Sequence, residues 1–202
     1  MKQIIVGITG ASGAAYGRRL VQCLANADVQ VHLVVSPYGL RVVHEELDLD
    51  ARDVPALLGY DSDRIRVHSH RELGAPIASG SFLTHGMVIC PCSSNTLAAV
   101  AGGIADNLIT RAAAVTLKEA RRLIVVPREM PLSQIEIGNM MQISQAGGII
   151  CPASPGFYLR PQHVEELVDF VVGRVLDLLG IDHDLRTRWA TAKHGPDSSP
   201  GD

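Results

Sequence analysis

An apolar run that leads straight into a glycine-rich turn is the strongest constraint on how this chain can fold. Residues 4–8 are apolar and mostly β-branched, and the next stretch reads Thr9-Gly10-Ala11-Ser12-Gly13. β-branched residues favour a strand, and glycines let the backbone turn tightly and approach a ligand. A helix that leaves such a turn directs free N–H groups and the positive end of its dipole at the turn. The stretch therefore predicts a strand, a turn and a helix around an anion such as a phosphate.

The glycine spacing does not match the two best-known phosphate loops. Gly7-x-x-Gly10-x-x-Gly13 is neither the dinucleotide fingerprint nor a P-loop, and no Lys follows Gly13. A magnesium-nucleotide site is therefore not favoured. A tight connection without any ligand is the structural alternative for this turn.

Short apolar segments alternate with helical segments along the rest of the chain. The predicted strands are residues 4–8, 29–35, 65–67, 87–90, 123–126 and 148–151, and the predicted helices are residues 12–27, 39–47, 97–103, 106–118, the second part of 131–146, and 164–179. Residues 48–63 read as an irregular surface excursion. The alternation predicts one α/β domain with a mostly parallel sheet and helices on both faces. Residues 191–202 are polar and rich in Pro, Ser and Gly, which predicts a disordered tail.

Ligands of parallel sheets bind beyond the carboxyl ends of the strands, and those ends carry polar groups here. They comprise residues 9–12, Ser36, residues 91–96, Arg128 and Glu129, and residues 152–158. Hydroxyls, backbone turns, one Arg and one Glu are thus predicted to meet at one edge of the sheet.

Composition argues against several classes of function. The net charge of −3 gives no general attraction for nucleic acid, and the apolar runs are strand-sized, so no membrane span is predicted. The four Cys and eight His show no metal-ligand spacing and no C-x-x-C pair. We interpret the thiols as reduced, in a cytoplasmic protein, and the histidines as surface or loop residues.

A series of short motifs follows one another in a fixed order from residue 4 to about residue 189. The motifs are Gly7-Ile-Thr-Gly-Ala-Ser-Gly13, Ala78-Ser-Gly-Ser81, Pro91-Cys-Ser-Ser-Asn-Thr96, Arg111-Ala-Ala, Leu117-Lys-Glu119, Val126-Pro-Arg-Glu129, Pro131-Leu-Ser133, Asn139-Met140 and Pro155-Gly-Phe-Tyr158. Together they resemble the flavin prenyltransferases of the UbiX type.

This resemblance implies a Rossmann-like (flavodoxin-like) three-layer domain over residues 1–190 that binds FMN. It implies transfer of a dimethylallyl group from dimethylallyl phosphate to N5 and C6 of reduced FMN, with closure of a fourth ring. The prenylated FMN then passes to a UbiD-type decarboxylase. Members of the family are homo-oligomers, commonly dodecamers built from trimers, with the site between subunits.

The resemblance also implies a role for individual residues. The implied FMN contacts are Gly10, Ala11, Ser12, Ser36, Ser93, Ser94, Asn95, Thr96 and Arg128. The implied donor contacts are Arg111, Lys118, Tyr158, Arg174 and Trp189. The implied catalytic residues are Ser12, Glu46, Lys118 and Glu129. Cations and a Tyr hydroxyl suit the charge that develops on a departing phosphate, and a well-bound monophosphate can depart without a metal ion. Glu129 and the departing phosphate are alternative acceptors for the proton lost in ring closure.

Each implied site residue also has a purely structural alternative. Ser12 and the Ser93 turn are possible helix caps, and Lys118 can complement a helix dipole. Arg174 can pair with Asp177 on one helix face. Glu46 is otherwise a solvated acid, Tyr158 loop packing and Trp189 an anchor for the end of the chain.

Two other functions are compatible with the fold. FMN-dependent peptidyl or phosphopantothenoyl cysteine decarboxylases are related, but they carry a His motif where this chain has Ala78 to Ser81 and Pro-x-Met-Asn where it has residues 127–131. A flavin-carrying module without catalysis is the third possibility. Ala114, Ala120 and Glu136 depart from the family pattern and bear on neighbouring ion pairs and on the choice between a monophosphate and a diphosphate donor.

Overall fold

A six-stranded sheet between two helical layers forms the body of the molecule. The computed structural model describes residues 1–185 and 187. Its strands lie in the order β3 (Ile65–His68), β2 (Val29–Val35), β1 (Lys2–Ile8), β4 (Gly86–Cys92), β5 (Leu123–Pro127) and β6 (Ile149–Ile150). Every neighbouring pair is parallel. The predicted α/β fold with a parallel sheet is confirmed.

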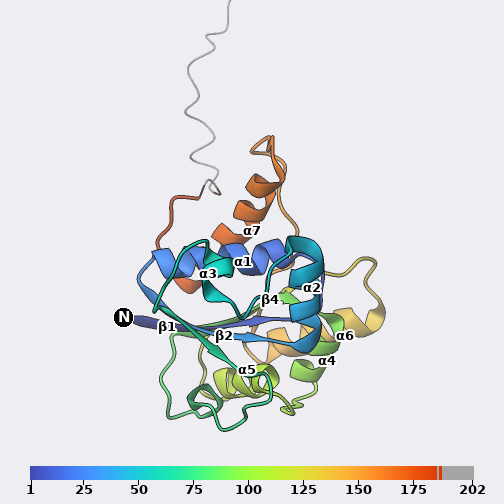
Figure 1. The fold of residues 1–202 in the computed structure, drawn as a ribbon. Coiled ribbons are helices and arrows are strands. Elements are labelled where there is room, and N and C mark those ends of the chain that lie inside the picture. Colours follow the sequence, from blue (N-terminus) through green and yellow to red (C-terminus); the bar gives the residue numbers. More distant parts are fainter. Residues whose placement is uncertain (186, 188–202) are drawn as a thin grey trace, which may run out of the picture.

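The helices divide between the two faces of the sheet. One face carries α1 (Ala14–Asn26), α2 (Pro37–Leu47), α3 (Val54–Leu58) and α7 (Val164–Leu179), above the sheet in Figure 1. The other carries α4 (Ser94–Ala101), α5 (Leu108–Lys118) and α6 (Gln134–Gln145), and a short 3₁₀ turn, η1 (Pro76–Ala78), packs against α5. In the described ranges no helix is long and apolar enough to cross a membrane.

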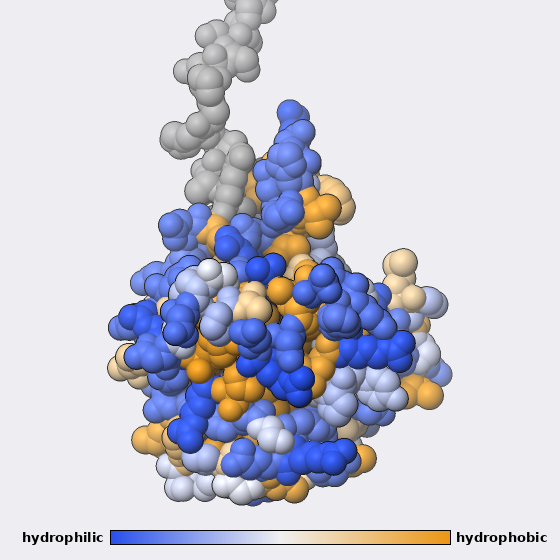
Figure 2. Space-filling model, viewed as in Figure 1, coloured by the Kyte–Doolittle hydropathy of each residue, from blue (hydrophilic) through white to orange (hydrophobic). Residues whose placement is uncertain are grey.

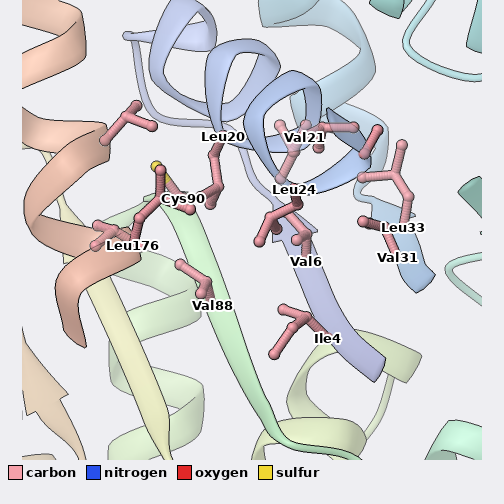
Figure 3. Close-up of a cluster of buried hydrophobic side chains, with 14 of the residues drawn as sticks. Ile4, Val6, Leu20, Val21, Leu24, Val31, Leu33, Val88, Cys90 and Leu176 are labelled. Carbon is pink, nitrogen blue, oxygen red and sulfur yellow. The ribbon is translucent and has the colours of Figure 1, made fainter. Parts of the chain in front are cut away.

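Alternating strand residues feed two separate apolar cores, as a parallel sheet covered on both faces requires. Val6 and Val88 pack under α1 and α7, where Figure 3 shows Leu24 of α1 beside Val6 and Leu176 of α7 beside Val88. On the other face, strand residues such as Ile5, Met87 and Ile89 pack with Leu97 of α4 and Leu108 of α5. The α1 layer and the α5 layer are therefore held apart by the full thickness of the sheet.

Chain direction places the ligand edge between β1 and β4. From β1 the chain builds outward through β2 to β3, and it then returns to β4 on the other side of β1. The carboxyl ends of β1 and β4 thus flank the point where the strand order reverses. Ligands of doubly wound sheets bind in the crevice outside this point, so the turns that follow β1 and β4 are the first place to look for a site.

Two local predictions were wrong, each because of a proline. Residues 48–63 contain α3, in which Asp53 accepts a hydrogen bond from Ala56 N–H (3.1 Å) and Gly59 ends the helix at φ 88°. Pro55 lies in the first helical turn, where its missing N–H costs nothing. Strand β4 also continues past Pro91 to Cys92, because its register shifts between Ile89 and Cys92 and proline is tolerated at such an irregularity.

The interpretation of all histidines as surface or loop residues was wrong for two of them. His32 and His68 are strand residues with 4% and 6% exposure. Nδ1 of His32 lies 2.9 Å from Nε2 of His68, and Nε2 of His32 lies 2.9 Å from Oε1 of Gln3. Burial, and then the proximity of His68 and Arg66, lower the pKa of His32 to about 4. The pair is therefore a neutral, hydrogen-bonded contact between β2 and β3.

We expect this pair to make the stability of the fold pH-dependent. An unfolded His32 titrates near pH 6.5 and the folded one near 4, so the unfolded chain binds more protons between these values. The contribution is complete above pH 6.5 and is lost as the pH falls towards 4, by about 3 kcal/mol. Thermal midpoints measured across this range should fall steeply for the wild type and less for His32→Gln, which does not titrate. Parallel curves for the two proteins would contradict the assignment.

Candidate functional site

Thr9 joins the turn after β1 to the turn after β4. Its N–H and its hydroxyl both donate to the carbonyl oxygen of Pro91, at 3.2 and 2.9 Å, and its hydroxyl accepts from Ser93 N–H at 2.8 Å. Thr9 is 1% exposed. The sequence motif contains Thr9, but no role was predicted for it; a threonine directly after a buried strand was the available signal.

The turn after β5 joins the same group. Nε of Arg128 donates to the carbonyl oxygen of Ser12 at 3.0 Å, and the hydroxyl of Ser94 donates to Glu129 Oε2 at 3.3 Å. Four residues from three separate sequence motifs therefore meet at the carboxyl edge. The predicted convergence of hydroxyls, one Arg and one Glu on this edge is confirmed.

The start of α1 is capped by a side chain from a distant part of the chain. The Glu46 carboxylate accepts hydrogen bonds from Gly13 N–H (3.0 and 3.1 Å) and Ala14 N–H (2.8 Å). Gly13 is the N-cap, with φ 105°, and no side chain of its own closes the helix. The interpretation of Ser12 as a helix cap is therefore wrong, and Glu46 is a capping residue rather than a freely solvated acid. The positive end of the α1 dipole already faces an anion, so a ligand phosphate is better placed elsewhere.

The start of α4 is open to a ligand. The Ser93 side chain caps this helix by accepting from Thr96 N–H, at 3.4 Å. The first N–H groups of a helix lack intrahelical partners, and those of Ser94 and Asn95 find none elsewhere in the described part of the chain. They can therefore bind an anion at the positive end of the α4 dipole. Ser36 caps α2 in the same way, with its hydroxyl accepting from Gly39 N–H at 3.0 Å.

A cavity of about 480 Å³ opens beside Arg128 and Glu129. Met130, Met140 and Pro152 contribute to its other walls. An apolar wall with one cation and one carboxylate suits an organic ligand that has a ring or chain at one end and polar groups at the other.

Aromatic and thiol groups beside the site are held in their protonated forms. Tyr16 lies under the glycine turn, 2.8 Å from the place where a Cβ on Gly13 would stand, and burial raises the pKa of its phenol. Burial likewise raises the pKa of the Cys90 and Cys92 thiols at the end of β4. Neither cysteine is therefore poised to act as a thiolate nucleophile.

Two of the predicted donor contacts, Arg111 and Lys118, belong to α5. Lys118 ends α5 a few residues before β5 begins at Leu123, which places it near the amino edge of the sheet, and β5 alone spans about 15 Å. Its ammonium group pairs with Glu119 at 2.7 Å. Arg111 donates to the carbonyl oxygen of Ala78 at 3.1 Å. The Lys118 ammonium group therefore does not reach the carboxyl edge of its own chain, while Arg111, in the first turn of α5, is held by the Ala78 carbonyl.

The other predicted donor contacts lie on the opposite face, around α7. The Tyr158 hydroxyl donates to the carbonyl oxygen of Thr187 at 3.4 Å, and its ring packs edge-on against Phe170. Arg174 pairs with Asp177 at 2.9 Å, as the structural alternative predicted. Trp189 lies outside the described residues. The predicted site residues thus occupy three separate places on one chain.

Comparison with known proteins places the chain in a family. The family model described as Flavoprotein matches residues 1–176. Over 188 residues, the flavin prenyltransferase UbiX of Halalkalibacterium halodurans is 48% identical, covering 91% of this chain and 91% of that protein. The chain belongs to the UbiX family of flavin prenyltransferases.

Solved structures of UbiX-like proteins have the same fold. AnUbiX (PadA1), in complex with FMN and dimethylallyl pyrophosphate, is 41% identical, with a TM-score of 0.86 over 93% of this chain and 97% of that chain. A dodecameric FMN-dependent UbiX-like decarboxylase from Escherichia coli O157:H7 is 44% identical, with a TM-score of 0.85 over 93% of this chain and 98% of that chain.

The carboxyl edge of this chain fits FMN chemically. The open start of α4 and the Arg128 guanidinium suit a phosphate, the hydroxyls of Ser36 and Ser94 suit a ribityl chain, and the apolar cavity beside Arg128 suits a ring system. Among the described residues, no group of three or more His, Cys, Asp and Glu side chains is placed to hold a metal ion.

Proposed function

We propose that this chain transfers a dimethylallyl group from dimethylallyl phosphate to reduced FMN and supplies the prenylated FMN to a UbiD-type decarboxylase. The observation that carries the proposal is the meeting of Ser12, Ser94, Arg128 and Glu129 at the strand-order reversal of a UbiX-family fold. When bound, reduced FMN supplies the nucleophilic atoms, N5 and C6.

The residues at the carboxyl edge hold and orient the flavin in this proposal. The free N–H groups of Ser94 and Asn95, together with Arg128, bind its phosphate. Ser12 is exposed at the edge and its side chain is not engaged as a cap, so it faces the reacting part of the flavin. Glu129, next to Arg128 in the chain and hydrogen-bonded to the Ser94 hydroxyl, can accept the proton released in ring closure, a role that the departing phosphate can share.

The cations assist the departure of the donor phosphate. Negative charge grows on the leaving oxygen as the allylic carbon–oxygen bond breaks, and fixed cations stabilise that charge without reorganising. Lys118 supplies a compact charge, while Arg111 and Arg174 supply planar donors suited to phosphate. Tyr158 adds a hydroxyl and, with Trp189, an aromatic face that attracts an allylic cation.

Such a site requires more than one copy of the chain. Lys118 and Arg174 lie on opposite faces of the sheet, and neither is placed beside Glu129, so one chain cannot surround a single donor phosphate. We propose a homo-oligomer, a dodecamer by family, whose sites are completed by neighbouring copies. Exposed apolar side chains support such contacts: Leu83, Ile104, Met130, Ile135 and Phe157. Figure 2 shows apolar surface across the middle of one face, between the two helical layers.

The test of the proposed function is a mass measurement on the flavin. The purified protein, mixed anaerobically with reduced FMN and dimethylallyl phosphate, should yield FMN heavier by one dimethylallyl group. Dimethylallyl diphosphate in a parallel reaction distinguishes the two donors. Recovery of unmodified FMN with either donor would contradict the proposal, and decarboxylation of a cysteine-ended peptide would favour the alternative. We place the reaction in the cytoplasm, where reduced flavin and free thiols such as Cys23 persist.

Ser12→Ala should separate flavin binding from catalysis. The backbone of the turn is held by Glu46 and Arg128, neither of which uses the Ser12 hydroxyl. We therefore expect the FMN dissociation constant to change by less than about threefold and the prenylation rate to fall about 100-fold. Ser144→Ala, at an exposed position of α6, is the matched control and should leave both unchanged. Loss of FMN with normal turnover of the bound fraction would show that Ser12 is a structural residue.

A further inference from the structure

Hydrogen bonds link the three turns of the site into a closed ring. Thr9 connects the β1 turn to the β4 turn through Ser93, Ser94 connects the β4 turn to Glu129, and Arg128 returns to the β1 turn at Ser12. Of these side chains, Thr9 is the buried one, at 1% exposure. We propose that Thr9 is a positioning residue, which sets the place of the α4 phosphate site relative to the reacting groups at Ser12 and Glu129. The proposal rests on the proposed function, in which this edge binds FMN.

The place of Thr9 in the sheet explains why a side chain is needed. Regular pairing of β1 with β4 ends at Gly7 and Ile89. Beyond Ile89, strand β4 also loses its regular register with its other neighbour, β5. Beyond these residues Thr9 bridges the gap: its N–H and hydroxyl donate to the Pro91 carbonyl oxygen at 3.2 and 2.9 Å, and only the hydroxyl reaches on to Ser93, accepting from its N–H at 2.8 Å. Ser93 is the N-cap of α4. The hydroxyl therefore fixes the residue from which the open N–H groups of α4 extend.

Only a hydroxyl can make both contacts at this position. Thr9 Oγ1 donates to the Pro91 carbonyl oxygen and accepts from Ser93 N–H. Valine has the same shape but can do neither, which leaves the Ser93 N–H without its partner and lets the α4 start move. Serine keeps both contacts and loses only a methyl group. The pair Thr9→Val and Thr9→Ser therefore separates the hydroxyl from the packing of the side chain.

Thr9→Val should weaken FMN binding and slow transfer without affecting the donor. Because the α4 start no longer has a fixed position, we expect the FMN dissociation constant to rise about tenfold. The prenylation rate at saturating FMN should fall a further tenfold or more, since small misplacements of reacting groups are costly. The KM for dimethylallyl phosphate should stay within about twofold, because its implied contacts lie on other parts of the chain. Thr9→Ser should remain within about threefold of wild type in all three quantities.

Thr116→Val controls for the loss of a buried hydroxyl. Thr116 is also 1% exposed, and its hydroxyl donates to the Ala112 carbonyl oxygen at 2.7 Å inside α5, away from the ring. The FMN affinity of the Thr116→Val protein should equal that of the wild type. FMN titration of the unreacted protein requires no prenyl transfer, so it tests Thr9 even if the proposed reaction fails. A folded Thr9→Val protein with wild-type FMN affinity and rate, or a Thr9→Ser protein as impaired as Thr9→Val, would overturn the proposal.

Discussion

Gly17→Ala, which adds a single methyl group, should destabilise the fold strongly. Gly17 lies in α1 where the helix crosses the sheet, and a Cβ at this position would stand 2.7 Å from the carbonyl oxygen of Cys90 and 3.1 Å from the Ile8 side chain. The oxygen belongs to the backbone of a central strand and cannot move aside. Overpacking of this kind typically costs 1–3 kcal/mol, and we expect about 3 kcal/mol here, net of the better helix propensity of Ala.

The same substitution should also empty the flavin site. Moving α1 away from β4 moves its first turn, and with it the contacts of Gly13 and Ala14 to Glu46. We expect the thermal midpoint to fall by about 5–10 °C and the purified protein to retain little FMN. Gly138→Ala is the matched control, because Gly138 is also helical and a Cβ added there would meet no atom within 4 Å. That variant should be as stable as the wild type or slightly more so. Equal midpoints for the two variants would show that α1 is not fixed by this contact.

The order of elements could be predicted from the sequence because each is set by neighbouring residues. The helical apolar spacing and Gly180 predicted α7 with its observed bounds, Val164–Leu179, and β2 was likewise predicted as Val29–Val35. Helix α3 was missed because Pro55 and Gly59 were interpreted as loop residues, although they are a helix start and a helix stop when Asp53 precedes them. Local signals are ambiguous when a helix is this short.

The convergence of the site could also be predicted, but not its internal contacts. A parallel sheet brings all strand ends to one edge, which is why Ser12, Ser94 and Arg128 meet. The partner of the α1 start could not be predicted, because Glu46 lies 33 residues beyond Gly13 and reaches it only through the packing of α2. Sequence spacing carries no information on which of several nearby acids makes such a contact.

The separation of the donor contacts from the flavin edge leads to the second major prediction. Lys118→Ala and Glu129→Gln should each lower prenylation about 100-fold when present in every subunit. In our proposal each site takes Lys118 from one subunit and Glu129 from another. An oligomer that mixes both kinds of subunit therefore contains some sites in which both residues are intact. With equal amounts and random assembly, about one quarter of the sites should be complete.

Co-expression of the two variants with different affinity tags, followed by purification on both tags, provides such mixed oligomers. Their activity should recover to about one quarter of the wild-type value, far above either parent. A mixture of Lys118→Ala subunits with Arg111→Ala subunits is the matched control: both residues belong to α5, so a site that takes this helix from one subunit always lacks one of them. This mixture should stay near the activity of its parents. No recovery in the Lys118 and Glu129 mixture would show that one chain supplies both residues, against their positions near opposite edges of its sheet. Recovery in the control would show that Lys118 and Arg111 of one site come from different subunits, against their place on one helix.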